Sequence, residues 1–295
     1  MTPPPARGAD EASAAPYLLT LSCPDRIGIV ADVARFLADH DCNIIESAQY
    51  GDLGNGRFFM RTGFEPAAPR TVSEFDTAFA PIAARYQMDA RFFDMRRRTP
   101  TLIMVSRFGH CLNDLLFRWR IGALPIDIKA VVSNHTDFAD LVAANGVPFH
   151  HLPVTPQTKT QQEEALDALA GEHGVELIVL ARYMQVLSSQ MCASRPGGII
   201  NIHHSFLPSF VGARPYHAAY KRGVKLIGAT AHYVTEELDE GPIIEQAVDR
   251  VTHNQSVTDY IAAGRDLEAL VLARAVQWHG EHRVLLNGGR TVIFH

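Results

Sequence analysis

The sequence lacks the marks of a secreted or membrane-spanning protein. Its four cysteines, Cys23, Cys42, Cys111 and Cys192, are far apart and form no Cys-x-x-Cys pair. This spacing argues against a disulfide framework and a zinc knuckle, and it is typical of reduced thiols in a cytosol. No stretch approaches the roughly 18 consecutive apolar residues that a membrane span requires. We therefore expect a cytoplasmic protein with no membrane partner.

An excess of positive charge is also missing. The chain carries 27 lysine and arginine residues against 32 aspartate and glutamate residues, a net charge of -5. A protein dedicated to nucleic acid usually shows a basic patch or stripe, so we expect no nucleic-acid partner. The one local run of positive charge, Arg96-Arg97-Arg98, precedes Thr99-Pro100 and is interpreted as an exposed linker.

The length and the hydrophobic content predict two folded domains. The chain has 295 residues, of which 47% are hydrophobic, enough for a sizeable core. Residues 1–16 are rich in proline and alanine and are predicted to be a disordered tail, not a signal peptide. We expect a first domain over residues 17–95, a linker over residues 96–100 and a second domain over residues 101–295.

The first domain shows the β-α-β-β-α-β order of the ferredoxin-like fold. Asp25 is a candidate cap for the first helix, whose predicted buried face is formed by Val30, Val33, Ala34 and Leu37. The second helix is expected to bury Phe75, Phe79, Ile82 and Ala83. The strands are predicted at residues 17–22, 43–50, 57–64 and 88–95, and the second helix at 73–86.

The second domain alternates short apolar strands with helical stretches, which predicts a Rossmann-type, mostly parallel sheet covered on both faces. Two longer strands and a long helix follow, and the end of the chain contains an apolar strand-like piece. The strands are expected at residues 101–106, 126–133, 149–154, 176–180, 198–201, 226–234 and 243–251, and the clearest helices at 161–173 and 256–278.

Two polar residues follow an apolar strand in a way that suggests chemistry. Asn201 and His203 lie two residues apart, so they point to the same side if the strand continues through them. Ligand sites in open α/β sheets lie at the carboxyl ends of strands. A carboxamide can stabilise a developing oxyanion, and an imidazole can move a proton near neutral pH.

A third polar group lies on a stiff turn. Asp239 shortly precedes Gly241-Pro242, and a carboxylate there could orient a water molecule or tune a histidine. Ser205 lacks the Gly-x-Ser-x-Gly context of an activated nucleophile. Water or an incoming amine is therefore the expected attacking group.

These residues carry a resemblance to a known family. The motif Asn-x-His-x-Ser-x-Leu-Pro from Asn201, followed by Leu-Asp-x-Gly-Pro-Ile from Leu238, resembles the folate-dependent formyltransferases. The resemblance implies that Asn201, His203 and Asp239 act on the formyl group of 10-formyltetrahydrofolate. It also implies a set of substrate-binding residues, namely Arg182, Tyr183, Met184, Gln185, Val186 and Leu187 in a loop lining the pterin pocket, together with His232 and Gly241.

The first domain narrows the resemblance. Its turn Cys23-Pro24-Asp25-Arg26-Ile27-Gly28 resembles that of an ACT regulatory domain. An ACT domain fused to a formyltransferase-like domain, with Gly-Ala-x-Pro-Tyr at residues 212–216, is similar to the formyltetrahydrofolate deformylases. That resemblance implies hydrolysis of 10-formyltetrahydrofolate to formate and tetrahydrofolate, which supplies formate to purine and one-carbon metabolism, with folate as substrate and no cofactor. It also implies an amino-acid effector near Asp25, Arg26 and Gly28, and a homodimer or homotetramer.

Two other functions stay open. A transferase of the same fold would give the formyl group to an amine, but residues 106–115 contain only Gly109 where a glycine-rich phosphate cradle is expected. A non-enzymatic folate or amino-acid sensor would need a degenerate catalytic set. The histidines His203, His204, His217 and His232 match no zinc spacing, so we expect no metal. His204 is expected to point away from His203.

Overall fold

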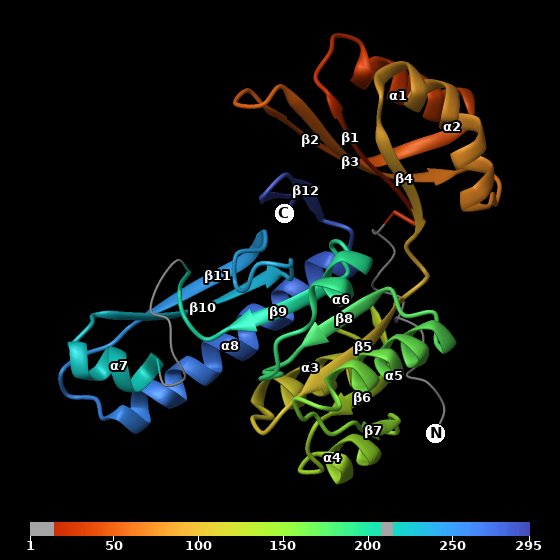
Figure 1. Ribbon diagram of the computed structural model, residues 1–295. Coiled ribbons are helices and arrows are strands. Elements are labelled where there is room, and N and C mark those ends of the chain that lie inside the picture. The colour runs from red at the N-terminus through yellow and green to blue at the C-terminus, as the bar shows by residue number, and fades with distance from the viewer. Residues whose placement is uncertain (1–14, 208–214) are drawn as a thin grey trace. The chain divides into compact units, whose positions relative to one another are not determined.

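The computed structural model describes residues 15–207 and 215–295, which form two compact units (Figure 1). One unit contains the described residues up to Arg98 together with Glu281–Leu285 and Val292–His295, and the other contains Thr99–Gly280 and Leu286–Thr291. The second domain predicted at residues 101–295 therefore extends too far, because two terminal segments group with the first unit. Residues 1–14 of the predicted tail lie outside the described residues. Pro16 is not a tail residue, since its carbonyl accepts a hydrogen bond from the Met95 N–H at 2.9 Å.

The N-terminal unit has the predicted βαββαβ order. Its antiparallel sheet has the strand order β2-β3-β1-β4. The elements are β1 (Tyr17–Pro24), α1 (Ile29–Asp39), β2 (Cys42–Asp52), β3 (Arg57–Pro66), α2 (Val72–Tyr86) and β4 (Asp89–Asp94). Helix α2 begins with a capping box in which the Thr71 side chain accepts from the Glu74 N–H while the Glu74 carboxylate accepts from the Thr71 N–H.

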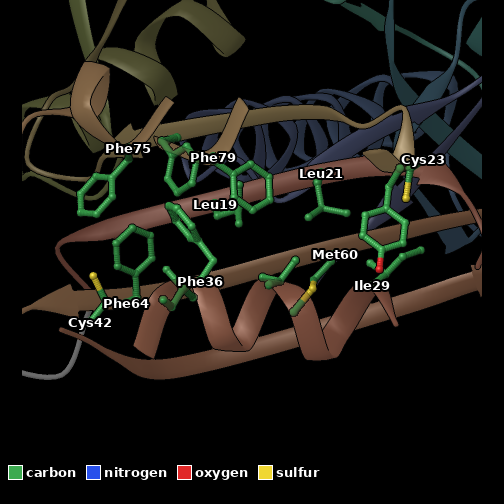
Figure 2. Close-up of a cluster of buried hydrophobic side chains, with 14 of the residues drawn as sticks. Leu19, Leu21, Cys23, Ile29, Phe36, Cys42, Met60, Phe64, Phe75 and Phe79 are labelled. Atoms are coloured by element: carbon green, nitrogen blue, oxygen red, sulfur yellow. The ribbon is translucent and has the colours of Figure 1, made fainter. Parts of the chain in front are cut away.

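The core between this sheet and its helices is rich in aromatic rings, several of which are drawn in Figure 2. Phe75 and Phe79 are buried as predicted, and the Phe75 ring stacks on Phe92 with centroids 5.5 Å apart. The predicted buried face of α1 is confirmed at Val33 and Leu37, wrong at Val30, and only partly buried at Ala34. Ile29 is buried and Val30 is exposed, because the helix turns Ile29, Val33, Phe36 and Leu37 toward the sheet.

The second unit contains the predicted mostly parallel sheet. Its strand order is β11-β10-β9-β8-β5-β6-β7. The strands from β9 to β7 in this order are parallel to one another, β10 is antiparallel to β9, and β11 is antiparallel to β10. The strands are β5 (Thr99–Val105), β6 (Ile126–Ser133), β7 (Phe149–His151), β8 (Leu177–Leu180), β9 (Ile199–His203), β10 (Leu226–Tyr233) and β11 (Ile243–Arg250). The helices are α3 (His110–Arg120), α4 (Ala139–Ala144), α5 (Lys159–Glu172), α6 (Ser189–Ser194), α7 (Pro215–Arg222) and α8 (Val257–Gly280).

The predicted linker at residues 96–100 is shorter than expected. Strand β5 already begins at Thr99, and the Pro100 carbonyl accepts from the Glu176 N–H at 2.9 Å. A proline near the start of a strand costs little because its missing N–H falls outside most of the ladder. Arg96 is held by the N-terminal unit, since its guanidinium pairs with Asp94 at 2.7 Å and lies over the Tyr17 ring.

The end of the chain forms a two-stranded hairpin instead of one strand-like piece. Strand β12 (Val284–Asn287) pairs with β13 (Arg290–Ile293), and Gly288 in the turn between them has a positive φ of 61°. All four cysteines are buried free thiols. Among the helices of residues 15–207 and 215–295, none combines the length and the apolar character of a membrane span.

Candidate active site

The site is built on one face of two neighbouring strands. Asn201 and His203 lie on β9 and point the same way, as their spacing predicts. In the antiparallel register of β9 and β10, His232 is the direct partner of Asn201, and Thr230 is the partner of His203. Residues opposite one another in such a pair lie on the same face. The register therefore gathers one amide and two imidazoles at the carboxyl end of β9.

The His232 ring fixes the amide of Asn201. His232 Nδ1 lies 2.9 Å from the Tyr233 carbonyl oxygen, and its Nε2 lies 3.2 Å from Asn201 Nδ2. A carbonyl can only accept, so we place the His232 proton on Nδ1. Nε2 is then free to accept one N–H of the Asn201 amide, and the second N–H of that amide is available for a ligand.

Asp239 connects the two histidines. Its Oδ2 lies 3.2 Å from His203 Nδ1, and its Oδ1 lies 3.7 Å from His232 Nε2. The hydrogen bond from His203 is the main cause that holds the pKa of Asp239 well below its usual range, against the effect of burial, whereas His232 Nε2, which accepts from Asn201, makes no hydrogen bond to the carboxylate at 3.7 Å. With Nδ1 directed at the carboxylate, His203 Nε2 is the nitrogen left for chemistry. It is buried and has no hydrogen-bond partner among the described residues.

The turn that carries Asp239 depends on a glycine. Asp239 itself adopts a positive φ of 59°, which aspartate tolerates better than most residues. At Gly241, an added Cβ would lie 1.7 Å from the Tyr233 carbonyl oxygen. The Tyr233 N–H also donates to the Pro242 carbonyl at 2.9 Å. The close approach at Gly241 therefore seats the Asp239 turn directly on the end of β10, beside His232.

Gly241→Ala is expected to damage the site and the stability of the second unit together. The methyl group must push the turn away from β10, and overpacking of this kind typically costs about 1–3 kcal/mol. We expect a lower midpoint in urea unfolding and a large loss of kcat, because Asp239 moves away from His203. Gly171→Ala is the control, since this helical glycine has open space around its Cβ. Equal behaviour of the two variants would contradict the role assigned to Gly241.

The chain leaves β9 in a tight turn held by buried polar groups. Thr230 Oγ1 donates to the Ser205 carbonyl at 2.9 Å and accepts from the Leu207 N–H at 3.1 Å. Because of this turn, the His204 ring stacks on His203 with centroids 4.8 Å apart, so the expectation that His204 points away is wrong. The Ser205 hydroxyl is buried with no hydrogen-bond partner among the described residues, and no base activates it.

The predicted pterin loop follows β8 and also lies at the carboxyl edge of the sheet. Met184 and Val186 are exposed, Tyr183 and Leu187 are buried, and Gln185 is intermediate. The Met184 N–H donates to Ser106 Oγ at 3.0 Å, and this hydroxyl donates to Asn134 Oδ1 at 2.8 Å. The loop after β8 is therefore tied to the ends of β5 and β6. It presents two apolar side chains to solvent, as a wall for a flat ring would.

The structure explains the lone glycine after β5. A Cβ on Gly109 would lie 2.3 Å from the Phe138 ring, so this glycine makes room for an aromatic side chain. The residue serves packing and forms no part of a glycine-rich cradle. This observation weakens the case for a phosphate-bearing acceptor.

A buried polar cluster was missed by the sequence analysis. The Glu268 carboxylate on α8, only 1% exposed, is 2.8 Å from His110 Nε2, 3.2 Å from Arg182 Nε and 2.5 Å from the Tyr216 hydroxyl. The one local feature of the sequence that could have indicated this cluster is Glu268 itself, an acidic residue within an apolar stretch of a long helix. In the part of the chain that the structure describes, His110, Cys111 and Glu268 are also the one trio whose ligand atoms could hold a metal, within 4.8 Å of one another.

The candidate regulatory residues form the turn before α1. Asp25 does not cap the helix as predicted, because Gly28 occupies the N-cap position with a φ of 101°. The Asp25 N–H donates to the Gly56 carbonyl, and Arg26 donates to the Gln87 side chain at 3.4 Å. A Cβ on Gly28 would lie 2.9 Å from the Tyr86 hydroxyl. The glycine is thus explained by packing and by its left-handed conformation, and an effector role for this turn stays a prediction.

Comparison with known proteins matches both units. The sequence model described as formyl transferase matches residues 100–276, and that of the ACT domain matches residues 17–79. A formyltetrahydrofolate deformylase from Corynebacterium sp. (strain P-1) is 51% identical over 94% of this chain and 97% of its own length. A solved structure of such a protein from Pseudomonas syringae pv. tomato superimposes with a TM-score of 0.94 at 47% identity, over 97% of this chain and 96% of that one. A second, from Burkholderia mallei, gives 0.91 at 51% identity, over 95% and 99%.

Proposed function

This chain belongs to the formyltetrahydrofolate deformylases, and we propose that it hydrolyses 10-formyltetrahydrofolate to formate and tetrahydrofolate. The observation that carries the proposal is the Asp239–His203 pair beside the amide of Asn201. These groups supply an oxyanion donor, a proton carrier and an anion that orients the carrier. None of them is an activated nucleophile, so water is the attacking group.

In the proposed reaction, a water molecule attacks the formyl carbon while the formyl oxygen gains negative charge. The free N–H of Asn201 and a protonated His203 Nε2 donate to this oxygen. Asp239 holds His203 through Nδ1 and so directs Nε2 at the formyl oxygen. Asp239 orients the water, directly or through His203, and helps to pass one of its protons to N10. The bond between the formyl carbon and N10 then breaks, tetrahydrofolate leaves with that proton on N10, and the formyl group leaves as formate.

The substrate wall is assigned to the loop after β8. Met184 and Val186 present exposed apolar surface at the same edge of the sheet as Asn201 and His203, which suits one face of a pterin ring. Folate is the substrate in this proposal, and none of the steps requires a further cofactor. An amino-acid effector at the ACT unit and a homodimer or homotetramer remain predictions, as does a cytoplasmic location.

The deciding experiment supplies 10-formyltetrahydrofolate to the purified protein with no amine acceptor. We expect formate and tetrahydrofolate to appear in equal amounts, because water alone completes the reaction. Formate is measured with a coupled dehydrogenase assay and tetrahydrofolate by its absorbance. Turnover that begins only when an amine is added would favour formyl transfer instead, and folate binding without turnover would favour a sensor.

A further inference from the structure

The buried carboxylate of Glu268 lies outside the proposed catalytic set, yet it joins three segments around it. His110 begins α3, Arg182 opens the loop after β8, and Tyr216 lies in the first turn of α7. A buried carboxylate is expensive unless it is paired and hydrogen-bonded. Burial raises the pKa of Glu268, but the bond from His110, the charge of Arg182 and the Tyr216 hydroxyl outweigh it and leave that pKa below its ordinary value. The carboxylate is therefore ionised and acts as a fixed anchor.

Of the three partners of Glu268, Arg182 has a backbone conformation that needs support from its contacts. Its backbone has a positive φ of 63°, a left-handed conformation that is unfavourable for a residue with a side chain. The guanidinium forms an ion pair with Glu268 at 3.2 Å, in a geometry that makes no hydrogen bond from Nε, and it lies 5.7 Å from the centroid of the Phe108 ring. The side chain is only 11% exposed. The Arg182 carbonyl also accepts from the Ser106 N–H at 3.3 Å. The conformation that starts the loop is thus held at both its backbone and its side chain.

The α7 partner reaches the same carboxylate over a glycine. A Cβ on Gly264 would lie 2.1 Å from the Tyr216 ring, so the ring packs directly against α8, one helical turn before Glu268. This packing delivers the Tyr216 hydroxyl to Glu268 Oε1. Gly264 and Glu268 therefore act together to hold Tyr216, because the glycine leaves room for its ring and the carboxylate accepts from its hydroxyl.

A divalent metal is the competing explanation for this cluster, and the contacts disfavour it. The Arg182 guanidinium already neutralises the carboxylate at 3.2 Å, and its positive charge would repel a metal ion. Burial raises the pKa of the Cys111 thiol well above its usual value, whereas a metal ligand must lose that proton.

We propose that Glu268 is a positioning residue that fixes the substrate loop, residues 182–187, through Arg182, and so sets the affinity for the folate substrate instead of the rate of the chemical step. This inference rests on the proposed function, because it takes the loop to be a wall of the folate site. Glu268 is placed as a support and is assigned no contact with the reacting atoms. Its loss should act on KM, whereas loss of Asn201 should act on kcat.

The test compares Glu268→Gln with the native protein. Glutamine keeps the shape and the acceptor oxygen but removes the charge that holds Arg182. We expect KM for 10-formyltetrahydrofolate to rise about 10- to 100-fold, because a displacement of about 1 Å in a positioned group can cost on the order of 100-fold and this loop is assigned to binding, with kcat changed less than about 3-fold. Asp167→Asn is the matched control, because it removes one charge from an exposed pair with Arg195 in the same unit. It should leave both constants unchanged.

A double-mutant cycle with Arg182→Gln separates positioning from general stability. If Glu268 acts through Arg182, the double variant should raise KM no more than either single variant. Additive effects on KM, an unchanged KM in folded Glu268→Gln, or one equivalent of zinc in the purified protein would each overturn the proposal. If Glu268→Gln does not fold, Arg182→Gln alone decides, since it removes only the loop side of the pair.

The two proposals fail in different ways. If the native protein releases no formate from 10-formyltetrahydrofolate, the proposed function is wrong, whatever the variants do. If the native protein turns over normally and Glu268→Gln has the native KM, only the positioning role of Glu268 is wrong. Binding of 10-formyltetrahydrofolate in an Asn201→Ala background gives a second readout, in which adding Glu268→Gln should weaken the Kd by the same factor as KM.

Discussion

Replacing Asp239 with asparagine is expected to lower kcat by about 10,000-fold, the loss observed when an amide replaces the carboxylate that orients a catalytic histidine. Asp239 can only accept from His203 Nδ1, at 3.2 Å, and this fixes which nitrogen is left for the reaction. The amide of asparagine can also donate, so it permits the wrong tautomer, and it removes the negative charge beside His203. Formate release at saturating substrate measures the effect.

The pH profile sharpens this prediction. The pKa of Asp239 lies far below its ordinary value, chiefly because the hydrogen bond from His203 favours the ionised form. A carboxylate with a depressed pKa keeps its charge at every pH above that value and loses it only in strong acid. A change in kcat between pH 5 and 9 therefore comes from a group other than Asp239, and a flat profile over that range would contradict a proton-carrying role for His203.

Glu240→Gln is the matched control for Asp239→Asn. Glu240 is the exposed neighbour in the same turn, so the variant removes the same charge without touching either histidine. Its kcat should remain within about 2-fold of the native value, as expected for a surface charge. If the two variants lost activity equally, the turn and not the Asp239 carboxylate would be the important feature.

The parts of the site set by local patterns could be predicted from the sequence. The two-residue spacing of Asn201 and His203 is the period of a strand, and the structure places both on one face of β9. Gly241-Pro242 marks a turn, and the structure brings Asp239 on that turn to His203. Local geometry was sufficient in each case, and the assignment of catalytic roles remains a proposal.

The parts set by register and by distant contacts could not be predicted. His232 meets Asn201 only because β9 and β10 pair in one particular register, which no short pattern encodes. Glu268 lies 158 residues from His110 and 52 from Tyr216, so no local sequence pattern predicts that these residues are in contact. The C-terminal hairpin did have a signal in Gly288-Gly289, a typical turn pair, but strands of four residues show too little alternation to support it.

Asn201→Ala is expected to lower kcat by about 100- to 1000-fold, the usual cost of removing one donor to an oxyanion. The amide is held in place before substrate arrives, because His232 Nε2 accepts one of its N–H groups at 3.2 Å and the Tyr233 carbonyl fixes the His232 proton. A donor fixed in advance stabilises the charge that develops in the transition state more than it stabilises the bound substrate. KM should therefore change little.

Asn145→Ala serves as the matched control for this variant. The Asn145 amide donates to the Leu141 carbonyl at the end of α4, so its loss removes one local hydrogen bond of about 1 kcal/mol and no proposed site group. Steady-state kinetics and urea unfolding on both variants separate chemistry from folding. Near-normal turnover in Asn201→Ala would remove the oxyanion role. A rise in KM with kcat unchanged would instead place Asn201 in ground-state binding, and stabilisation of the formyl oxygen would then fall to His203 alone.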